Sequence, residues 1–588
     1  GDSFTTAELT AVAELDAAAV RAGIDALMRQ EALTRHDPAH PGSVEQLRFH
    51  EQLVQEIAYR TLARRDRRRY HLAAAAYLEQ HAGDAGVEEL ARHLVSAYRA
   101  DPAQADRDIA RRANAALEVA ARRATALHAP ERALGHLTAA LSLPPDGVDQ
   151  PSLVEGAATA AQAAGQFKTA ERHWRELVAL RTQAQDRAGA ARATARLAGL
   201  MFMEHSNDAA LQEVDAALRA LGKVSRDDPA GVELASQLAR AHFIRGDPVE
   251  ARTWAERALK TAERLNLAAV ATDALITRGT ALLALGQTKA GMKDLNRAID
   301  RCTDGELLAL ELRARNNLAW LLVGDDPRAT LRAAREGFVI GHQKGMRDMA
   351  LQLASVAMAV AADTGDWQWA LDTMEELDDE SMVPAHLIDL AASTTIIRAL
   401  RGDRHPDAAL ANLEPFAPDT DPQVAALATL ARAWIALLGC HFGVALRLAN
   451  DAAAASIGFN RNAALVLGVR AALWADRPDA ADELLETLKS GQPKGRAIQA
   501  AIRSLEGGLA ARRGRPKLAA ARYRSAFRAW QQLDLPLPHA LGLIERDGFL
   551  PAEADPGETS AALQRLGAAG LQALTRRAAR GTSSRAVE

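Results

Sequence analysis

The sequence predicts an all-α protein, an α-solenoid of helical hairpins that follows a small N-terminal segment of mixed structure. Turn-forming breaks recur along the 588 residues at intervals of about 40 residues, which is the range of a two-helix repeat. The composition agrees, because the chain is rich in Ala, Leu and Arg and only 4% aromatic, so strand formers are scarce. We therefore expect no sheet beyond the N-terminal segment. The breaks lie near Ala129, Gly165, Asn207, Gly246, Gly286, Gly324, Gly365, Gly402, Gly439, Asp476 and Gly514.

The first 60 residues do not follow the repeat and predict a winged-helix-like segment. Helical stretches over 4–15 and 16–28 precede a loop over 35–42 and a short strand at 47–49, and helices followed by a small β-wing are the layout of a winged helix. His36, Asp37 and His40 lie in this loop. Since no third His or Cys lies nearby, we interpret them as exposed wing residues and not as metal ligands.

Residues 61–150 are predicted to be junction helices and the first repeat. A basic cluster opens this stretch at Arg64, Arg65, Arg67, Arg68 and Arg69. On a helix these positions wrap most of the circumference, which favours a solvated, domain-contacting face over DNA binding. His71 follows Tyr59 in near helical phase, and we interpret it, like His50, as a structural residue.

The repeat array is predicted over 151–535, with capping helices and a tail over 536–588. At Gly246 a left-handed Gly ends one helix and Pro248 opens the next. Ala251 and Ala258 then lie on one face of the second helix, where its backbone must pass close to the first. The same frame recurs at Gly514, Ala519 and Ala526, at Gly165 and Ala170, at Gly365 and Ala370, and at Gly286, Gly291 and Ala298.

This order of Gly, Ala and Ala resembles the tetratricopeptide repeat. The tetratricopeptide period is about 34 residues, so these repeats are longer, as in the variant found in maltose-regulator-like sensors. The first helices of successive hairpins in such a solenoid line a concave surface. The tetratricopeptide frame places six candidate residues for binding a peptide or small anion there: Gln237, Arg240, Asp273, Thr277, Thr280 and Arg315.

The junction resembles a second family. Its residues are Phe49-His50, Leu53, Gln55-Glu56, Ala58-Tyr59, the Arg cluster, His71 and Leu78-Glu79. This series looks like the segment that joins the winged helix to the repeats in STAND-type signal-transduction ATPases, with the closest likeness to bacterial proteins that carry a class III adenylate/guanylate cyclase domain. Residues 563–568 with Arg576-Arg577 are similar to the end of the array in LuxR-type members.

The STAND resemblance implies a parent protein in which an upstream nucleotide-binding domain holds ATP and Mg²⁺. It also implies that the junction residues contact neighbouring domains. A start at Gly1 fits an excised piece of such a protein. The candidate domain-contact residues are His50, Tyr59, Arg67, Arg68 and His71.

Catalytic motifs are missing from the sequence. A phosphate-binding loop needs Gly-x4-Gly-Lys-Ser/Thr, and the nearest string, at 286–293, displaces the Lys and lacks the hydroxyl. We find no nucleophile elbow, no His-Glu-x-x-His and no Cys-x-x-Cys. We therefore expect no enzymatic activity, cofactor or metal in this chain.

Charge and hydropathy limit the partners. A net charge of −4 argues against a broad nucleic-acid-binding surface. The absence of a long apolar run or signal peptide predicts no membrane contact and a cytoplasmic protein. Cys302 and Cys440, far apart in sequence, fit small buried side chains in a reduced protein. Trp367 and Trp369 beside Gly365 are interpreted as packing residues before ligand anchors.

Binding is thus the predicted function. The leading hypothesis is a regulatory sensor, in which a protein, peptide or small-molecule effector on the array biases a two-state contact with the ATPase module. The alternatives are a freestanding protein-interaction scaffold and the repeat region of a LuxR-type transcriptional activator that lacks its DNA-binding domain.

Overall fold

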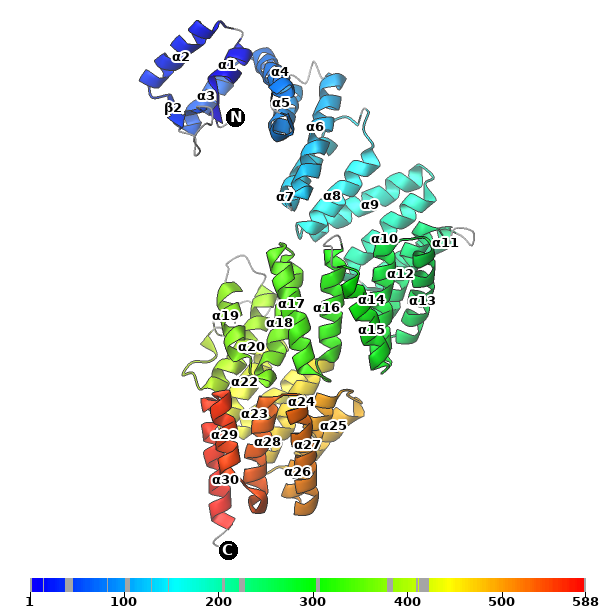
Figure 1. The fold of residues 1–588 in the computed structure, drawn as a ribbon, viewed down its shortest axis with the longest axis vertical. Helices are drawn as coiled ribbons and strands as arrows, with labels where there is room; N and C mark the ends of the chain where they lie inside the picture. Colours follow the sequence, from blue (N-terminus) through cyan, green and yellow to red (C-terminus); the bar gives the residue numbers. More distant parts are fainter. Residues whose placement is uncertain are drawn as a thin grey trace. The chain divides into compact units, whose positions relative to one another are not determined.

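The computed structural model confirms the all-α solenoid (Figure 1). It describes residues 3–13, 15–36, 46–81, 83–100, 106–127, 129–145, 147–203, 207–221, 228–302, 307–377, 384–408, 411 and 422–585. Over these ranges the strands are confined to the first 50 residues. None of the helices described is long and apolar enough to cross a bilayer. The chain forms two compact units, Gly1–Ala241 and His242–Glu588.

The first unit opens with the predicted helices and a small antiparallel sheet of order β1-β3-β2. Val20, Ile24 and Leu47 form its core. Two predictions were wrong. Phe4, expected to begin a helix, lies in a strand and pairs with Leu47. The loop expected from residue 35 starts later, because Arg35 and His36 pair with Leu47 and Gln46. Asp37 and His40 lie outside the described residues. The elements are β1 (Ser3–Phe4), α1 (Thr6–Ala13), α2 (Ala17–Arg29), β2 (Leu33–His36) and β3 (Gln46–Phe49).

From α4 to α11, the helices of the first unit pack as a chain of neighbours, each against the next. Whether the opening segment is a winged helix stays a prediction. The helices are α3 (Gln52–Thr61), α4 (Arg64–His81), α5 (Val87–Ala100), α6 (Arg107–Ala126), α7 (Pro130–Leu141), α8 (Gln150–Ala163), α9 (Phe167–Gln183), α10 (Arg187–Met203), α11 (Asn207–Leu221) and α12 (Pro229–Ile244).

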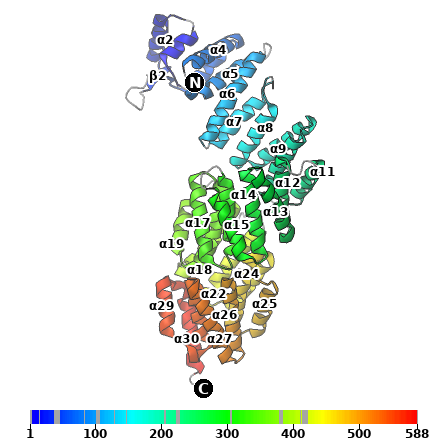
Figure 2. The ribbon, with the colours of Figure 1, turned by 45° about the vertical axis from the view of Figure 1, so that its right-hand side comes forward.

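The second unit continues the hairpins (Figure 2). Its helices are α13 (Pro248–Arg264), α14 (Ala268–Ala284), α15 (Thr288–Asp300), α16 (Leu308–Leu322), α17 (Pro327–Gln343), α18 (Arg347–Thr364), α19 (Trp367–Leu377), α20 (Pro384–Arg401), α22 (Pro422–Leu438), α23 (Phe442–Ala455), α24 (Gly458–Trp474), α25 (Pro478–Ser490), α26 (Arg496–Arg512), α27 (Pro516–Gln532), α28 (Pro536–Phe549), α29 (Pro556–Leu566) and α30 (Gln572–Arg585), with the short 3₁₀ turn η5 (Ala569–Leu571) before α30.

The predicted breaks all fall at helix ends, and the predicted small residues are buried. Gly246 and Gly286 have φ of 81°, the left-handed value that Gly adopts without steric cost. Ala251 is fully buried. A Cβ on Gly291 would lie 2.7 Å from the carbonyl oxygen of Gly279, so α14 and α15 cross backbone to backbone. The small residues therefore set the hairpin spacing, as the sequence indicates.

The second unit also closes on itself along a line of contacts that we call the seam. Here the turns at 324–328, 362–366 and 399–402 meet residues 494–498, 534–536 and 569–570. The amide of Ile498 donates to the carbonyl of Gly324 over 3.0 Å. A Cβ on Gly495 would collide with the carbonyl oxygen of Gly324, and one on Gly570 with that of Ala399. The seam is thus a backbone-to-backbone contact between distant repeats.

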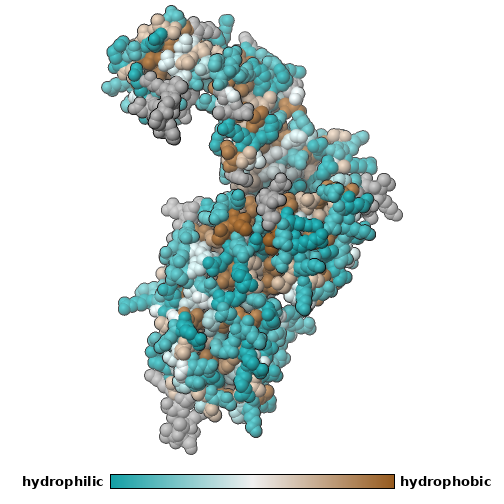
Figure 3. All heavy atoms as spheres, viewed as in Figure 1, coloured by the Kyte–Doolittle hydropathy of each residue, from teal (hydrophilic) through white to brown (hydrophobic). Residues whose placement is uncertain are grey.

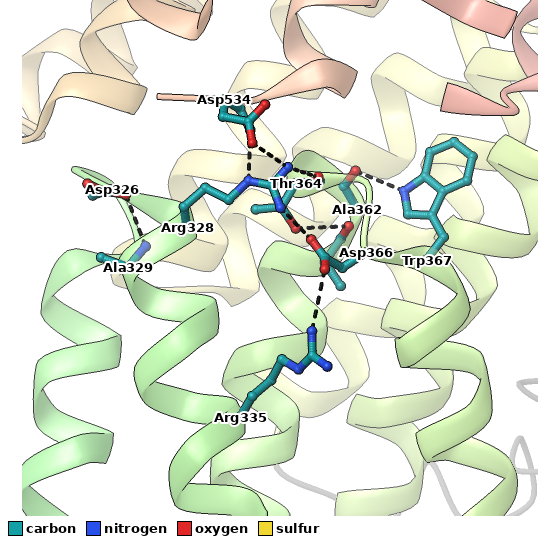
Figure 4. A network of polar contacts seen from close by, with 10 residues as sticks. Asp326, Arg328, Ala329, Arg335, Ala362, Thr364, Asp366, Trp367 and Asp534 are labelled. Atoms are coloured by element: carbon teal, nitrogen blue, oxygen red, sulfur yellow. Dashed lines mark hydrogen bonds and ion pairs between the residues drawn. The ribbon is translucent and has the colours of Figure 1, made fainter. Parts of the chain in front are cut away.

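Charged side chains surround the middle of the seam (Figure 4). Arg328 binds Asp366 at 2.6 Å and the carbonyl of Thr364 on one side, and Asp534 at 3.0 Å on the other. Arg335 also reaches Asp366, at 3.4 Å. Because Arg has donors in a rigid fork, one side chain holds both sides of the seam.

We predict that Gly495→Ala destabilises the second unit by about 1–3 kcal/mol more than Gly514→Ala, the typical cost of overpacking. Both glycines have positive φ, 119° at Gly495 and 69° at Gly514, but a Cβ on Gly514 meets nothing within 4 Å. The difference between the two variants therefore contains the clash with Gly324 together with the greater backbone strain at Gly495. Urea unfolding of both variants measures the difference. Equal destabilisation would show that the seam does not hold the closed arrangement.

Candidate partner-binding surfaces

Three of the residues predicted to bind a ligand, Asp273, Thr277 and Thr280, are buried and lie along α14 where it packs against α16. Arg313 from α16 forms an ion pair with Asp273 and donates to the Thr277 hydroxyl over 3.3 Å. Asn317 donates to Thr280 over 3.2 Å. This polar ladder satisfies buried groups between neighbouring first helices. Ligand binding by these residues stays a prediction.

The other three predicted residues are partly accessible. Arg315 keeps 14% of its side chain exposed and binds Glu311 at 3.0 Å and Glu336 at 2.6 Å. In the first unit, the guanidinium of Arg240 lies 5.3 Å from the ring centroid of Phe202. Gln237 is half-buried on the same helix, α12. Gln237 and Arg240 belong to the first unit and the other four residues to the second. Ligand binding by the set stays a prediction.

The junction residues form a hydrogen-bonded series across α3, α4 and α5. The hydroxyl of Tyr59 lies 3.0 Å from Nε2 of His71, and Nδ1 of His71 lies 2.9 Å from Nδ1 of His93. Arg67 donates to the carbonyls of Leu62 and Arg60 over 3.0 and 2.8 Å. These residues fix the angle between the junction helices. Contact with a further domain stays a prediction.

The other junction candidates lie at the edge of this series. Arg68 forms an ion pair with Asp106 at 3.3 Å. The side chain of His50 is exposed, while its backbone amide donates to the carbonyl of Ala32 over 3.0 Å. His93, which is half-buried, was not among the candidate domain-contact residues, because its place one helix beyond His71 gives no local signal of their contact.

Burial lowers the pKa of both histidines, to about 4 for His71 and about 3 for His93. Their unfolded forms titrate near an ordinary pKa of 6.5. Below that pH the unfolded chain binds protons that the folded chain does not, so stability is full above pH 6.5 and falls as the pH drops towards 4.

We predict that His93→Gln, which removes one of these titrating groups, reduces the loss of stability between pH 7 and pH 5. The measurement is the midpoint of urea unfolding of the first unit at both pH values. Exposed His50→Gln serves as the matched control and should retain the loss seen in the unchanged protein. If the control and His93→Gln behave alike, the buried pair is not the source of the acid sensitivity.

A second buried titratable group lies in the second unit, where α18, α24 and α28 meet. Arg470 and Glu545 form an ion pair at 2.6 Å with both side chains almost inaccessible. Asp363 of α18 also feels the charge of Arg470, and burial raises the pKa of Asp363 to about 6 against the opposing effect of that charge. Two carboxyl groups therefore share one buried positive charge.

We predict that Asp363→Asn stabilises the second unit above pH 6. Between the ordinary Asp pKa of 3.8 and the value of about 6, the folded chain holds a proton that the unfolded chain has lost, so stability falls as the pH rises through this window. Thermal unfolding at pH 5 and pH 8 should show a smaller difference in Asp363→Asn than in the exposed control Asp451→Asn. An unchanged difference would contradict the shared-charge arrangement.

The tryptophans and cysteines beside the repeat turns are packing residues. Trp367 is 5% exposed, and its indole donates to the carbonyl of Ala362 over 3.0 Å (Figure 4). Arg335 stacks over the ring of Trp369 with 4.7 Å to the centroid. Cys302 is buried, which raises the pKa of its thiol to about 11, and Cys440 is half-buried. The packing interpretation of Trp367 and Cys302 is confirmed.

Exposed apolar side chains gather on α3. The face of the molecule in Figure 3 is mainly hydrophilic, with hydrophobic residues in small groups. By contrast Leu53 is 61% exposed and Ile57 56%, and these residues lie one helical turn apart. No residue of α3 is buried. Leu53, Val54 and Ile57 form what we call the α3 surface.

Two arginines follow α3 in the chain, at the start of α4. Arg64 and Arg65 are exposed and have no ion pair or hydrogen bond to any residue that the structure describes. An exposed apolar face followed in the chain by cations without counterions suits a partner that has an apolar patch and acidic side chains. The sequence pattern indicated the arginines and Leu53, but it did not predict that Leu53 and Ile57 form an exposed apolar face, although their i, i+4 spacing indicates that they share one side of a helix.

Comparisons with known proteins return solved structures of low similarity. No protein-family model and no curated protein sequence matches it. A STAND protein with a tetratricopeptide repeat sensor from Pyrococcus horikoshii superposes with a TM-score of 0.35 and 13% identity, over 70% of this chain and 60% of that one. The Cut9 chain of the APC/C Cut9–Hcn1 complex superposes with a TM-score of 0.37 and 12% identity, over 79% of this chain and 96% of that one. Yeast Tom70 superposes with a TM-score of 0.31 and 12% identity, over 75% of this chain and 97% of that one.

Proposed function

We propose that this chain is the non-catalytic regulatory module of a multidomain, cytoplasmic signalling ATPase. The α3 surface is the observation that carries the proposal, because it leaves Leu53 and Ile57 in water at the place where the junction resembles that of STAND ATPases. Burying two such side chains in an interface contributes several kcal/mol at about 1.5–3 kcal/mol each. A neighbouring domain with an apolar patch and acidic rim would supply that burial.

In this proposal the partner of the α3 surface is the nucleotide-binding domain. Arg64 and Arg65 would orient it through acidic side chains, since charges at an interface rim set register and association rate more than affinity. The helical array would bind the effector, a protein, peptide or small molecule. An effector that favours the released form shifts the equilibrium of this contact and thereby ATP hydrolysis.

We predict that Leu53→Ser with Ile57→Ser raises basal ATP hydrolysis of the parent protein about fivefold or more, because losing a central apolar contact costs over about 1 kcal/mol. The measurement is steady-state hydrolysis without effector. Leu127→Ser is the matched control, since Leu127 is 60% exposed and lies elsewhere in the unit.

Two results would overturn the proposal. Hydrolysis that is unchanged in the α3 variant would show that α3 does not restrain the ATPase. A native polypeptide without a nucleotide-binding domain, found by intact mass, would favour a freestanding scaffold that uses the same surface for a separate protein.

A further inference from the structure

A small cavity in the first unit gathers three arginines. It has a volume of about 60 Å³ and lies between α8, α9, α10 and α12. Trp174 and Leu177, both nearly inaccessible, form its apolar wall. A water molecule needs about 10–15 Å³ measured in this way. The cavity therefore holds a group of a few atoms and not a whole nucleotide or sugar. Its charged lining consists of Glu155, Arg181, Arg192, Arg196 and Glu233.

Two of the arginines that line the cavity lie on α10. Arg192 and Arg196 are exposed, one helical turn apart, and have no ion pair or hydrogen bond within the described part of the chain. Like charges at this spacing repel and destabilise a helix by a few tenths of a kcal/mol. An anionic group between the two guanidinium groups would remove that cost.

The third arginine is held in place by the chain itself. Arg181 binds Oδ2 of Asp186 at 3.2 Å, while Oδ1 of Asp186 accepts the amide of Gly189 over 2.8 Å. A Cβ on Gly189 would approach Cδ of Arg181 to 2.9 Å, so Gly at this position leaves room for the arginine. The positive side of the cavity is thus preorganised before any ligand binds.

The charge balance selects the kind of anion. The lining holds three arginines and two glutamates, a surplus of one positive charge, which suits a singly charged ligand better than a multiply charged one. The planar guanidinium fork matches a carboxylate through two parallel hydrogen bonds. We propose that this cavity binds a single carboxylate group, supplied by a small carboxylic acid or by the C-terminus of a peptide. The inference deepens the proposed effector role of the array and rests on it.

Calorimetric titration of the whole chain at low salt tests the proposal with acetyl-trialanine, its C-terminal amide, acetate and inorganic phosphate as probes. We expect saturable binding of acetyl-trialanine, no binding of the amide, and about tenfold weaker binding to Arg196→Gln, as expected for one charged hydrogen bond. Arg192→Gln provides a second variant. Arg172→Gln, an exposed arginine of α9 outside the cavity, is the matched control and should bind normally.

The probes also distinguish a peptide C-terminus from a small carboxylic acid as the source of the carboxylate group. Tighter binding of acetyl-trialanine than of acetate supports a peptide terminus, and equal binding supports a small acid. Equal binding of acid and amide, equal weakening in Arg172→Gln, or tighter binding of phosphate overturns the carboxylate site. Because the titration needs no ATPase, its failure leaves the α3 result intact, and an unchanged ATPase in the α3 variant leaves the titration intact.

Discussion

The close approach of backbones at the seam is the constraint on which the second unit depends. Gly495 meets the carbonyl of Gly324, and Gly570 meets that of Ala399, at distances that a Cβ would not allow. An open solenoid depends only on contacts between neighbouring repeats. Here residues as far apart as Arg328 and Asp534, 206 positions in sequence, are bound as well. The unit therefore has the non-local contacts of a globular domain, and its repeats cannot shift independently.

This closure changes where a partner finds accessible groups. The first helices α14 and α16 bury Asp273 and Thr277 against Arg313, and α18, α24 and α28 meet around the buried pair of Arg470 and Glu545. Polar groups in these places are satisfied by the chain and offer little to a ligand. The first unit keeps accessible cationic groups as well, since Arg64 and Arg65 on α4 and Arg192 and Arg196 on α10 are exposed and have no counterion among the described residues.

The sequence predicts the helical hairpins of this structure well and the contacts between distant repeats poorly. Gly246, Ala251 and Gly291 predict the hairpins, because helix caps and close helix crossings need small residues at fixed intervals along the chain. The seam has no such signal, since Gly495 meets a partner 171 residues away and a repeat pattern does not specify which turns meet. The tetratricopeptide frame likewise assigned a face to Asp273 without the information that Arg313, from the next repeat, would cover it.

The sequence also does not show which of its arginines stay without a counterion, so neither the exposure of the α3 surface nor the cavity could be predicted. A charged residue in a sequence gives no sign of whether a carboxylate will reach it, and only the structure separates Arg68, paired with Asp106, from its exposed neighbour Arg64. A positive charge without a counterion costs the chain little in water but becomes useful when a partner excludes that water. Exposed arginines without a counterion in the folded chain are therefore the residues at which we expect an anionic partner to bind.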